Sequence, residues 1–284
     1  MPLESASERA SKPSLVSTNH LTKLVLTVQG GMLKVASVQP KEARLARSGA
    51  RRGKVYGQSP KSRKRLLERV ATISTARLMV FITLTYGEND PNAELAKQHL
   101  HTFLQRLYRK APRAAIIWKM EYQQRGAIHF HLLCFNLPYI DKGSIQQAWG
   151  EITNQDRPFT RIEAIRSRKK ALSYVAKYMA KRPTQSSGFN YVPYPNVPVL
   201  WSGRTWGIRG ACHIPYATKT VIKLGFGRKN KEKSRWVGVA YALLRQRAAK
   251  IYPPIAFYEE IGFTVLTEHS DSIIEDLTYV FSLC

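Results

Sequence analysis

Acidic residues and cysteines are both scarce in this sequence of 284 residues. Asp and Glu together number 19 against 45 Lys and Arg, which gives a formal net charge of +26 at pH 7. Such an excess excludes an ordinary cytosolic metabolic enzyme and indicates a polyanionic partner, with nucleic acid before an anionic membrane surface. The 3 cysteines lie far apart and form no CxxC pair, which argues against a zinc ribbon and a disulfide framework.

Long hydrophobic runs are also absent. The strongest apolar stretch, between Leu78 and Leu84, is far too short to cross a bilayer. The first 14 residues lack the hydrophobic region of a signal peptide. We therefore expect a cytoplasmic protein without a membrane partner. No G-x-x-x-x-G-K-[ST] motif occurs, so the sequence does not predict a fused P-loop helicase.

Charge is distributed unevenly along the chain. Residues 251–284 contain six acidic residues and no Lys or Arg, so the basic surface belongs to the preceding residues. We predict a basic, partly flexible N-terminal extension over 1–77. A folded domain with a basic C-terminal extension follows over 78–250, and an acidic tail over 251–284 completes the chain.

From residue 78 onward the hydrophobic pattern alternates between strand-like and helix-like periods. The predicted elements are strands over 78–86, 114–122, 127–135 and 159–165, and helices over 91–110, 143–149 and 167–181. Asp90 is the expected N-cap of the first helix. One crossover and a central hairpin predict an α+β, ferredoxin-like (RRM-like) fold with a central antiparallel sheet and helices on one face.

Two histidines stand two residues apart in an apolar strand. His129 and His131 therefore point to the same face, about 7 Å apart. Two neutral imidazoles supply half of a metal site, although a bare His-x-His pair is common by chance. Glu121 is the candidate third ligand, an oxygen suited to Mg²⁺ or Mn²⁺, and the alternative is a surface carboxylate. A two-residue hairpin turn would pair Glu121 with Ile128, on the wrong face, whereas a bulge or longer loop would bring it to the histidines.

The helix over 167–181 has a polar face of unusual composition. At about 100° per residue, Lys177, Tyr178 and Lys181 lie within roughly 60° of Tyr174, opposite an aliphatic stripe. An ordinary amphipathic helix with its lysines in solvent is the alternative interpretation. A phenol oxygen can attack a phosphodiester that a metal polarises, and a lysine one turn away can hold the phosphate.

Three segments resemble the motifs of HUH-superfamily rolling-circle replication initiators. Residues 81–86 resemble the first motif, 121–131 the metal motif and 174–181 the nucleophile motif. The last is similar to the two-tyrosine form of microvirus and related phage and plasmid Rep proteins. The tyrosines follow the histidines, as in Rep proteins, whereas conjugative relaxases have the reverse order. The resemblance covers about residues 78–181.

The resemblance implies a metal-dependent DNA endonuclease and strand transferase that acts on single-stranded origin DNA. Glu121, His129 and His131 would hold Mg²⁺ or Mn²⁺, which polarises the scissile phosphate. The reaction would leave a 5′-phosphotyrosine and a free 3′-OH that primes synthesis, with a host helicase and polymerase as partners. The catalytic residues that it implies are Tyr174, Tyr178, Lys177 and Lys181.

Two other interpretations stay open. A single-strand transposase uses the same chemistry but depends on element ends instead of a replication origin. A non-catalytic basic nucleic-acid-binding protein would bind DNA without metal and leave it intact. Trp201, Trp206 and a helix over 234–250 are candidates for DNA contact in any of these cases, although the tryptophans could equally belong to the core.

Overall fold

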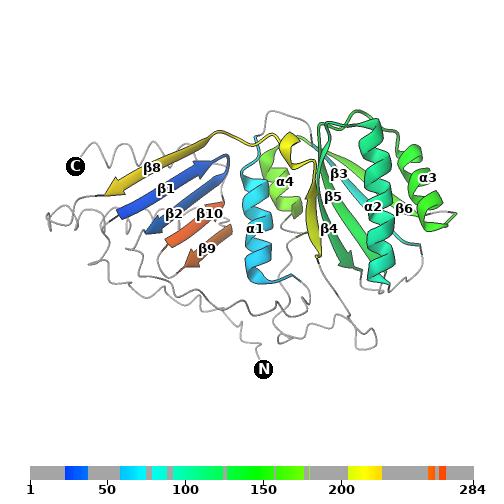
Figure 1. Cartoon of the computed structure of the whole chain (residues 1–284), viewed down its shortest axis with the longest axis horizontal. Helices are drawn as coiled ribbons and strands as arrows, with labels where there is room; N and C mark the ends of the chain where they lie inside the picture. The colour runs from blue at the N-terminus through cyan, green and yellow to red at the C-terminus, as the bar shows by residue number, and fades with distance from the viewer. Residues whose placement is uncertain are drawn as a thin grey trace, which may run out of the picture.

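The computed structural model describes residues 23–37, 58–74, 79–87, 92–123, 127–156, 158–175, 179, 204–225, 255–259 and 262–266. These residues form two five-stranded sheets with helix α1 (Pro60–Ala71) between them (Figure 1). We call the sheet that carries the sequence motifs the motif sheet and the other the terminal sheet. In the described part of the chain, no helix is both long and apolar enough to traverse a lipid bilayer.

The motif sheet is antiparallel throughout, in the order β6-β3-β5-β4-β7. Its strands are β3 (Met79–Thr85), β4 (Ala115–Tyr122), β5 (Ile128–Phe135), β6 (Phe159–Ile165) and β7 (Trp206–Arg209). Apolar runs in β3, β4 and β5 place them in the middle of the sheet, where both faces are buried. The α+β class and the ferredoxin-like antiparallel sheet predicted from the sequence are confirmed.

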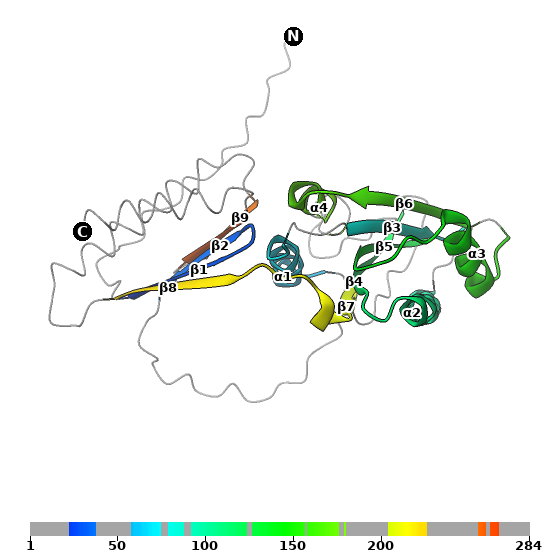
Figure 2. The same ribbon diagram turned by 90° about the horizontal axis from the view of Figure 1, so that it is seen from above.

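Helices cover both faces of the motif sheet, which corrects the expectation of a single covered face (Figure 2). Helices α2 (Ala93–Lys110) and α3 (Lys142–Thr153) pack on one face, and α1 and α4 (Arg168–Tyr174) pack on the other. The physical reason is visible in β3, where Ile82 and Leu84 face α2 and α3 while Phe81 faces α1 and α4. A strand that is apolar at successive positions needs cover on both sides.

The predicted N-cap of α2 differs from the structure. Asn92, not Asp90, is the N-cap of α2, because its side-chain oxygen accepts hydrogen bonds from the backbone N–H groups of Glu94 (3.1 Å) and Leu95 (3.0 Å). Helix α4 begins where the helix predicted over 167–181 should begin, and Ser167 caps it by accepting a hydrogen bond from the N–H of Lys170. Most of the second half of that predicted helix lies outside the described residues.

Of the terminal sheet, the sequence indicates only a possible strand over 21–28, which overlaps the first strand of this sheet. Its order is β8-β1-β2-β10-β9, with all neighbours antiparallel. Its strands are β1 (Lys23–Gln29), β2 (Met32–Ser37), β8 (Lys219–Gly225), β9 (Ile255–Glu259) and β10 (Gly262–Leu266). The division of the chain at residues 77 and 250 stays a prediction, but this sheet joins strands from all three predicted parts.

The β1–β2 turn fastens the terminal sheet to the end of α1. Gly30 has φ +55°, and a Cβ there would lie 2.7 Å from the carbonyl oxygen of Ala71. The backbone N–H of Gly31 donates to the same carbonyl at 2.8 Å. This close approach requires glycine at the turn and satisfies a carbonyl at the helix end.

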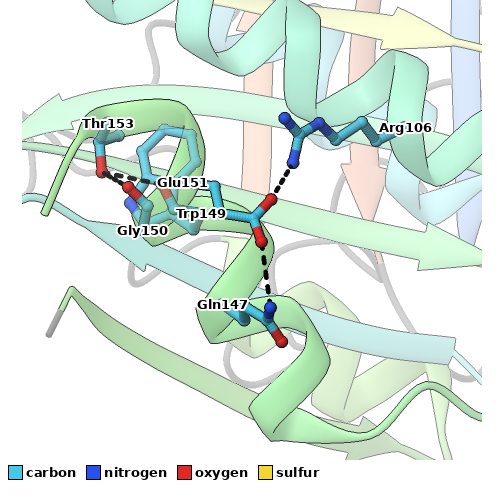
Figure 3. A network of polar contacts seen from close by, with 6 residues as sticks. All are labelled: Arg106, Gln147, Trp149, Gly150, Glu151 and Thr153. Atoms are coloured by element: carbon cyan, nitrogen blue, oxygen red, sulfur yellow. Dashed lines mark hydrogen bonds and ion pairs between the residues drawn. The ribbon is translucent and has the colours of Figure 1, made fainter. Parts of the chain in front are cut away.

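Trp149 of α3 anchors the other face of the motif sheet. Its fully buried indole N–H donates to the Thr85 carbonyl at 3.2 Å, and its ring meets those of Tyr86 and Phe103 edge to face. Around it, Glu151 accepts from Arg106 of α2 at 2.7 Å and from Gln147 at 3.1 Å (Figure 3). The exposed ion pair contributes little, so burial of the indole carries most of the stability of this interface.

Replacing Trp149 with alanine should lower the free energy of unfolding by about 3–5 kcal/mol, because the change leaves a large cavity and an unpaired carbonyl. Urea unfolding followed by circular dichroism measures this loss. Gln147→Ala on the same helix removes only an exposed hydrogen bond and should change stability by about 0.5 kcal/mol or less. Equal losses in the two variants would contradict the assignment of Trp149 as the anchor.

Candidate metal centre and nucleophile helix

The connection between β4 and β5 decides which face Glu121 occupies. The backbone N–H of Gln123 donates to the Ala127 carbonyl at 2.7 Å, and Glu121 pairs directly with His129. The connection is one residue longer than a two-residue turn, so the predicted pairing of Glu121 with Ile128 is wrong. The longer-loop alternative is the one that occurs, and it places the carboxylate on the histidine face.

Glu121, His129 and His131 converge on one point. The Oε2 atom of Glu121 lies 3.4 Å from Nε2 of His129 and 3.4 Å from Nε2 of His131. One ligand atom from each residue lies within 4.8 Å of the others. Metal–ligand bonds of about 2.0–2.2 Å in tetrahedral or octahedral geometry separate adjacent ligand atoms by about 3–3.6 Å. The three side chains therefore fit a divalent cation, and we call them the triad.

The electrostatics of the triad keep its carboxylate ionised. Burial raises the pKa of Glu121, but hydrogen bonds from His129 and His131 and the charge of Lys119 together lower it to about 2. Lys119 is itself only 5% exposed, and burial lowers its pKa to about 8 against the opposing effect of Glu121. The Thr83 hydroxyl lies 3.3 Å from Nδ1 of His131, where it orients the ring from the side away from the carboxylate.

Two residues of this site, Lys119 and Thr83, were not among the candidates predicted from the sequence. Lys119 is directly opposite His131 in β5, and His131 is directly opposite Thr83 in β3. The period of two along β4 places Lys119 on the same face as Glu121. Lys119 could therefore have been found from the sequence. Thr83 could not, because its position beside His131 depends on the order of the strands in the sheet.

Tyr174 lies on the same face of the motif sheet as the triad. Its half-buried ring meets Phe81 at 5.1 Å between centroids, and Phe81 also meets the ring of His131 at 5.5 Å between centroids. The phenol donates a hydrogen bond to the carboxylate of Glu163 on β6, which is the main cause of the lowered pKa of Glu163. Glu163 also pairs with Arg161, so the tyrosine hydroxyl is held by an anchored carboxylate.

The buried side chains of α4 determine how the helix positions the ring of Tyr174. Ala171, Leu172 and Val175 are buried in the same apolar cluster as Phe81, so the aliphatic stripe predicted from the sequence packs against the sheet. The other predicted catalytic residues, Lys177, Tyr178 and Lys181, lie outside the described residues, as do Trp201 and the predicted helix over 234–250.

Metal binding is testable without any assay of activity. Saturating Mn²⁺ should raise the melting temperature of the protein, because a ligand at 100 times its Kd stabilises the folded state by about 2.7 kcal/mol. The increment between metal-free and metal-loaded protein should vanish in Glu121→Gln and in His131→Ala. Differential scanning fluorimetry at neutral pH measures it.

The matched control is His101→Ala, which removes an exposed imidazole from α2, on the opposite face. It should keep the full increment. A metal-induced increment that survives in both triad variants would place the binding site elsewhere.

Comparisons with known proteins bear on the segment that carries this site. No curated protein matches the chain. A solved structure, the hypothetical protein ORF119 from Sulfolobus islandicus rod-shaped virus 1, is similar at 20% sequence identity over 44% of this chain and 97% of that chain, with a TM-score of 0.31. With a TM-score this low, the similarity supports no conclusion about the fold or the function of this chain.

A family model gives the informative match. It spans β3 to the residues after α4 and so includes the triad and both candidate tyrosines. Residues 79–183 match the family Replication-associated protein ORF2/G2P, which is consistent with a rolling-circle replication initiator family and supports a role in replication.

Proposed function

We propose that this chain is a metal-dependent endonuclease and strand transferase that nicks single-stranded origin DNA and so starts rolling-circle replication. The observation that carries the proposal is the shared face of the triad and Tyr174, where the Phe81 ring contacts both Tyr174 and His131. The family match over residues 79–183 supports the same conclusion. A host helicase would unwind the template and a host polymerase would extend the primer, in the host cytoplasm.

The triad would hold Mg²⁺ or Mn²⁺, which when bound supplies polarisation of a phosphoryl oxygen. The chain's own residues prepare this position. The carboxylate of Glu121 stays ionised at all physiological pH values, and Thr83 fixes the ring of His131. The cation of Lys119, on the same face, adds positive charge where a phosphate would lie.

The proposed reaction is an in-line displacement at phosphorus. The phenol oxygen of Tyr174 or Tyr178 forms a bond to phosphorus while the bond from phosphorus to the 3′ oxygen breaks. For Tyr174, the phenol proton passes to the carboxylate of Glu163, and the departing 3′ oxygen takes a proton from water. The products are a 5′-phosphotyrosine and a 3′-OH end that primes synthesis. Lys177 and Lys181 are proposed to hold the phosphate charge.

The tyrosine assignment predicts the outcome of three variants. The double variant Tyr174→Phe/Tyr178→Phe should form no covalent adduct on a labelled single-stranded oligonucleotide that carries the origin. Each single variant should retain an adduct through the other phenol. Denaturing electrophoresis with mass spectrometry of the linked peptide measures this, and Tyr108→Phe on α2 is the control. An undiminished adduct in the double variant would remove both residues from the mechanism.

Glu163 is the proposed positioning group and proton acceptor of Tyr174. Glu163→Gln keeps the size of the side chain but removes its charge, so the adduct at Tyr174 should form about 10²-fold more slowly, as on loss of a general base. The adduct at Tyr178 serves as an internal control, since both are measured in one sample. A general defect in folding would lower both adducts together, and an unchanged ratio would contradict this role for Glu163.

A further inference from the structure

A polar cavity opens beside the candidate metal centre, on the same face of the motif sheet. It measures about 1020 Å³ and lies between α1, β7 and the β1–β2 end of the terminal sheet. Its basic and aromatic lining consists of Arg65, Arg69, Arg204, Trp206 and Tyr216. We call it the α1–β7 cleft. Neither the triad nor Tyr174 lines it.

One residue of the cleft, Trp206, lies only two strands away from His131 of the triad. Trp206 of β7 is directly opposite Lys119 of β4, and Lys119 is directly opposite His131 of β5. Two steps between neighbouring strands correspond to about 10 Å. One strand of stacked nucleic acid advances about 3.4 Å per nucleotide, so this gap equals about three nucleotides, or fewer in an extended strand.

Positive charge dominates the cleft. Arg65 and Arg69 are exposed one helical turn apart on α1, and Arg204 is exposed at the approach to β7. The acidic residue of the lining, Glu68, is already paired with Lys64 at 3.8 Å and with Lys34 at 4.0 Å. The lining therefore keeps a net positive charge, which favours an anion.

The aromatic rings of the cleft are held in fixed positions. The indole N–H of Trp206 donates to the Ser62 hydroxyl at 2.7 Å. The guanidinium of Arg69 lies over the ring of Tyr216 at 5.9 Å and contacts its hydroxyl at 3.4 Å. Both rings are partly exposed. Rigid rings between arginines suit unpaired bases, whose faces can stack, whereas the faces of bases in a duplex are already stacked on one another.

We infer that the α1–β7 cleft binds single-stranded DNA within a few nucleotides of the scissile phosphate, with phosphates at Arg65 and Arg69 and a base against Trp206. The cleft holds the strand in register while the triad and Tyr174 act on it. The identity of the polyanion rests on the proposed function, but the binding itself can be tested apart from any cleavage.

The test is fluorescence anisotropy of the full chain with a labelled 20-nucleotide single strand in EDTA, over a range of salt concentrations. Arg65→Gln/Arg69→Gln should weaken binding and reduce the slope of log K against log salt by about 1.4, which is about 0.7 for each lost phosphate contact. Trp206→Leu should weaken binding at least about fivefold with an unchanged slope, because it removes stacking and no charge. Trp206→Phe keeps a ring and should restore most of the affinity.

The matched control is Arg109→Gln/Lys110→Gln, which removes two exposed positive charges from α2 on the opposite face of the sheet. It should leave the slope within experimental error of the wild type. An equal change of slope in both double variants would overturn the cleft as the binding site. A duplex of the same sequence that binds as tightly, and is as sensitive to Trp206→Leu, would overturn the choice of a single strand.

The outcomes separate this inference from the proposed function. Strand cleavage by the wild type with no effect of the cleft variants on binding would refute the cleft and leave the nuclease intact. Loss of binding in those variants without any covalent adduct in the wild type would refute the nuclease and leave a single-strand-binding cleft.

Discussion

The pairing of Glu121 with His129 across the β4–β5 hairpin is the constraint on which the candidate site depends. Side chains alternate between the faces of a strand, so a shift of one residue would move the carboxylate to the opposite side of the sheet. One additional residue in the connection, closed by the hydrogen bond between Gln123 and Ala127, gives the required register. The triad then comes from two adjacent central strands, which hold it more rigidly than loops would.

Helices α1 and α4 cover the face of the motif sheet that carries the triad, and α4 brings Tyr174 to that face. A motif sheet covered on one side only would leave the triad open to water, with no partner for a reaction. Burial of Leu172 and Val175 brings α4 onto the face that carries His131, and Phe81 contacts the rings of both that histidine and Tyr174. The phenol is bound to Glu163 at the edge of the sheet. Phe81 therefore belongs both to the apolar cluster and to the surroundings of the candidate site, and a change to Phe81 would disturb both.

The terminal sheet packs against α1, on the side away from the motif sheet (Figure 1). Its strands come from both ends of the chain, and it meets α1 through Met32 and Leu266 in the cluster that also supports the motif sheet. Helix α1 thus belongs to two layers at once (Figure 1). Its outer residues, Arg65 and Arg69, line the α1–β7 cleft, so basic residues of the predicted N-terminal extension contribute to a defined surface.

The sequence by itself determined the properties that depend on local periodicity. These are the strands and helices between residues 78 and 175, the shared face of His129 and His131, and the aliphatic stripe beneath Tyr174, because backbone geometry repeats every 2 or 3.6 residues whatever the surroundings. Tertiary structure alone decided which face of the sheet Glu121 occupies and that Tyr174 forms a hydrogen bond with Glu163. It also decided that α1 and α4 cover the second face of the motif sheet and that the terminal sheet forms. Each of these depends on pairing between segments distant in sequence or on the length of one loop, and the strength of such contacts comes from burial and hydrogen bonds that exist only once the layers have assembled.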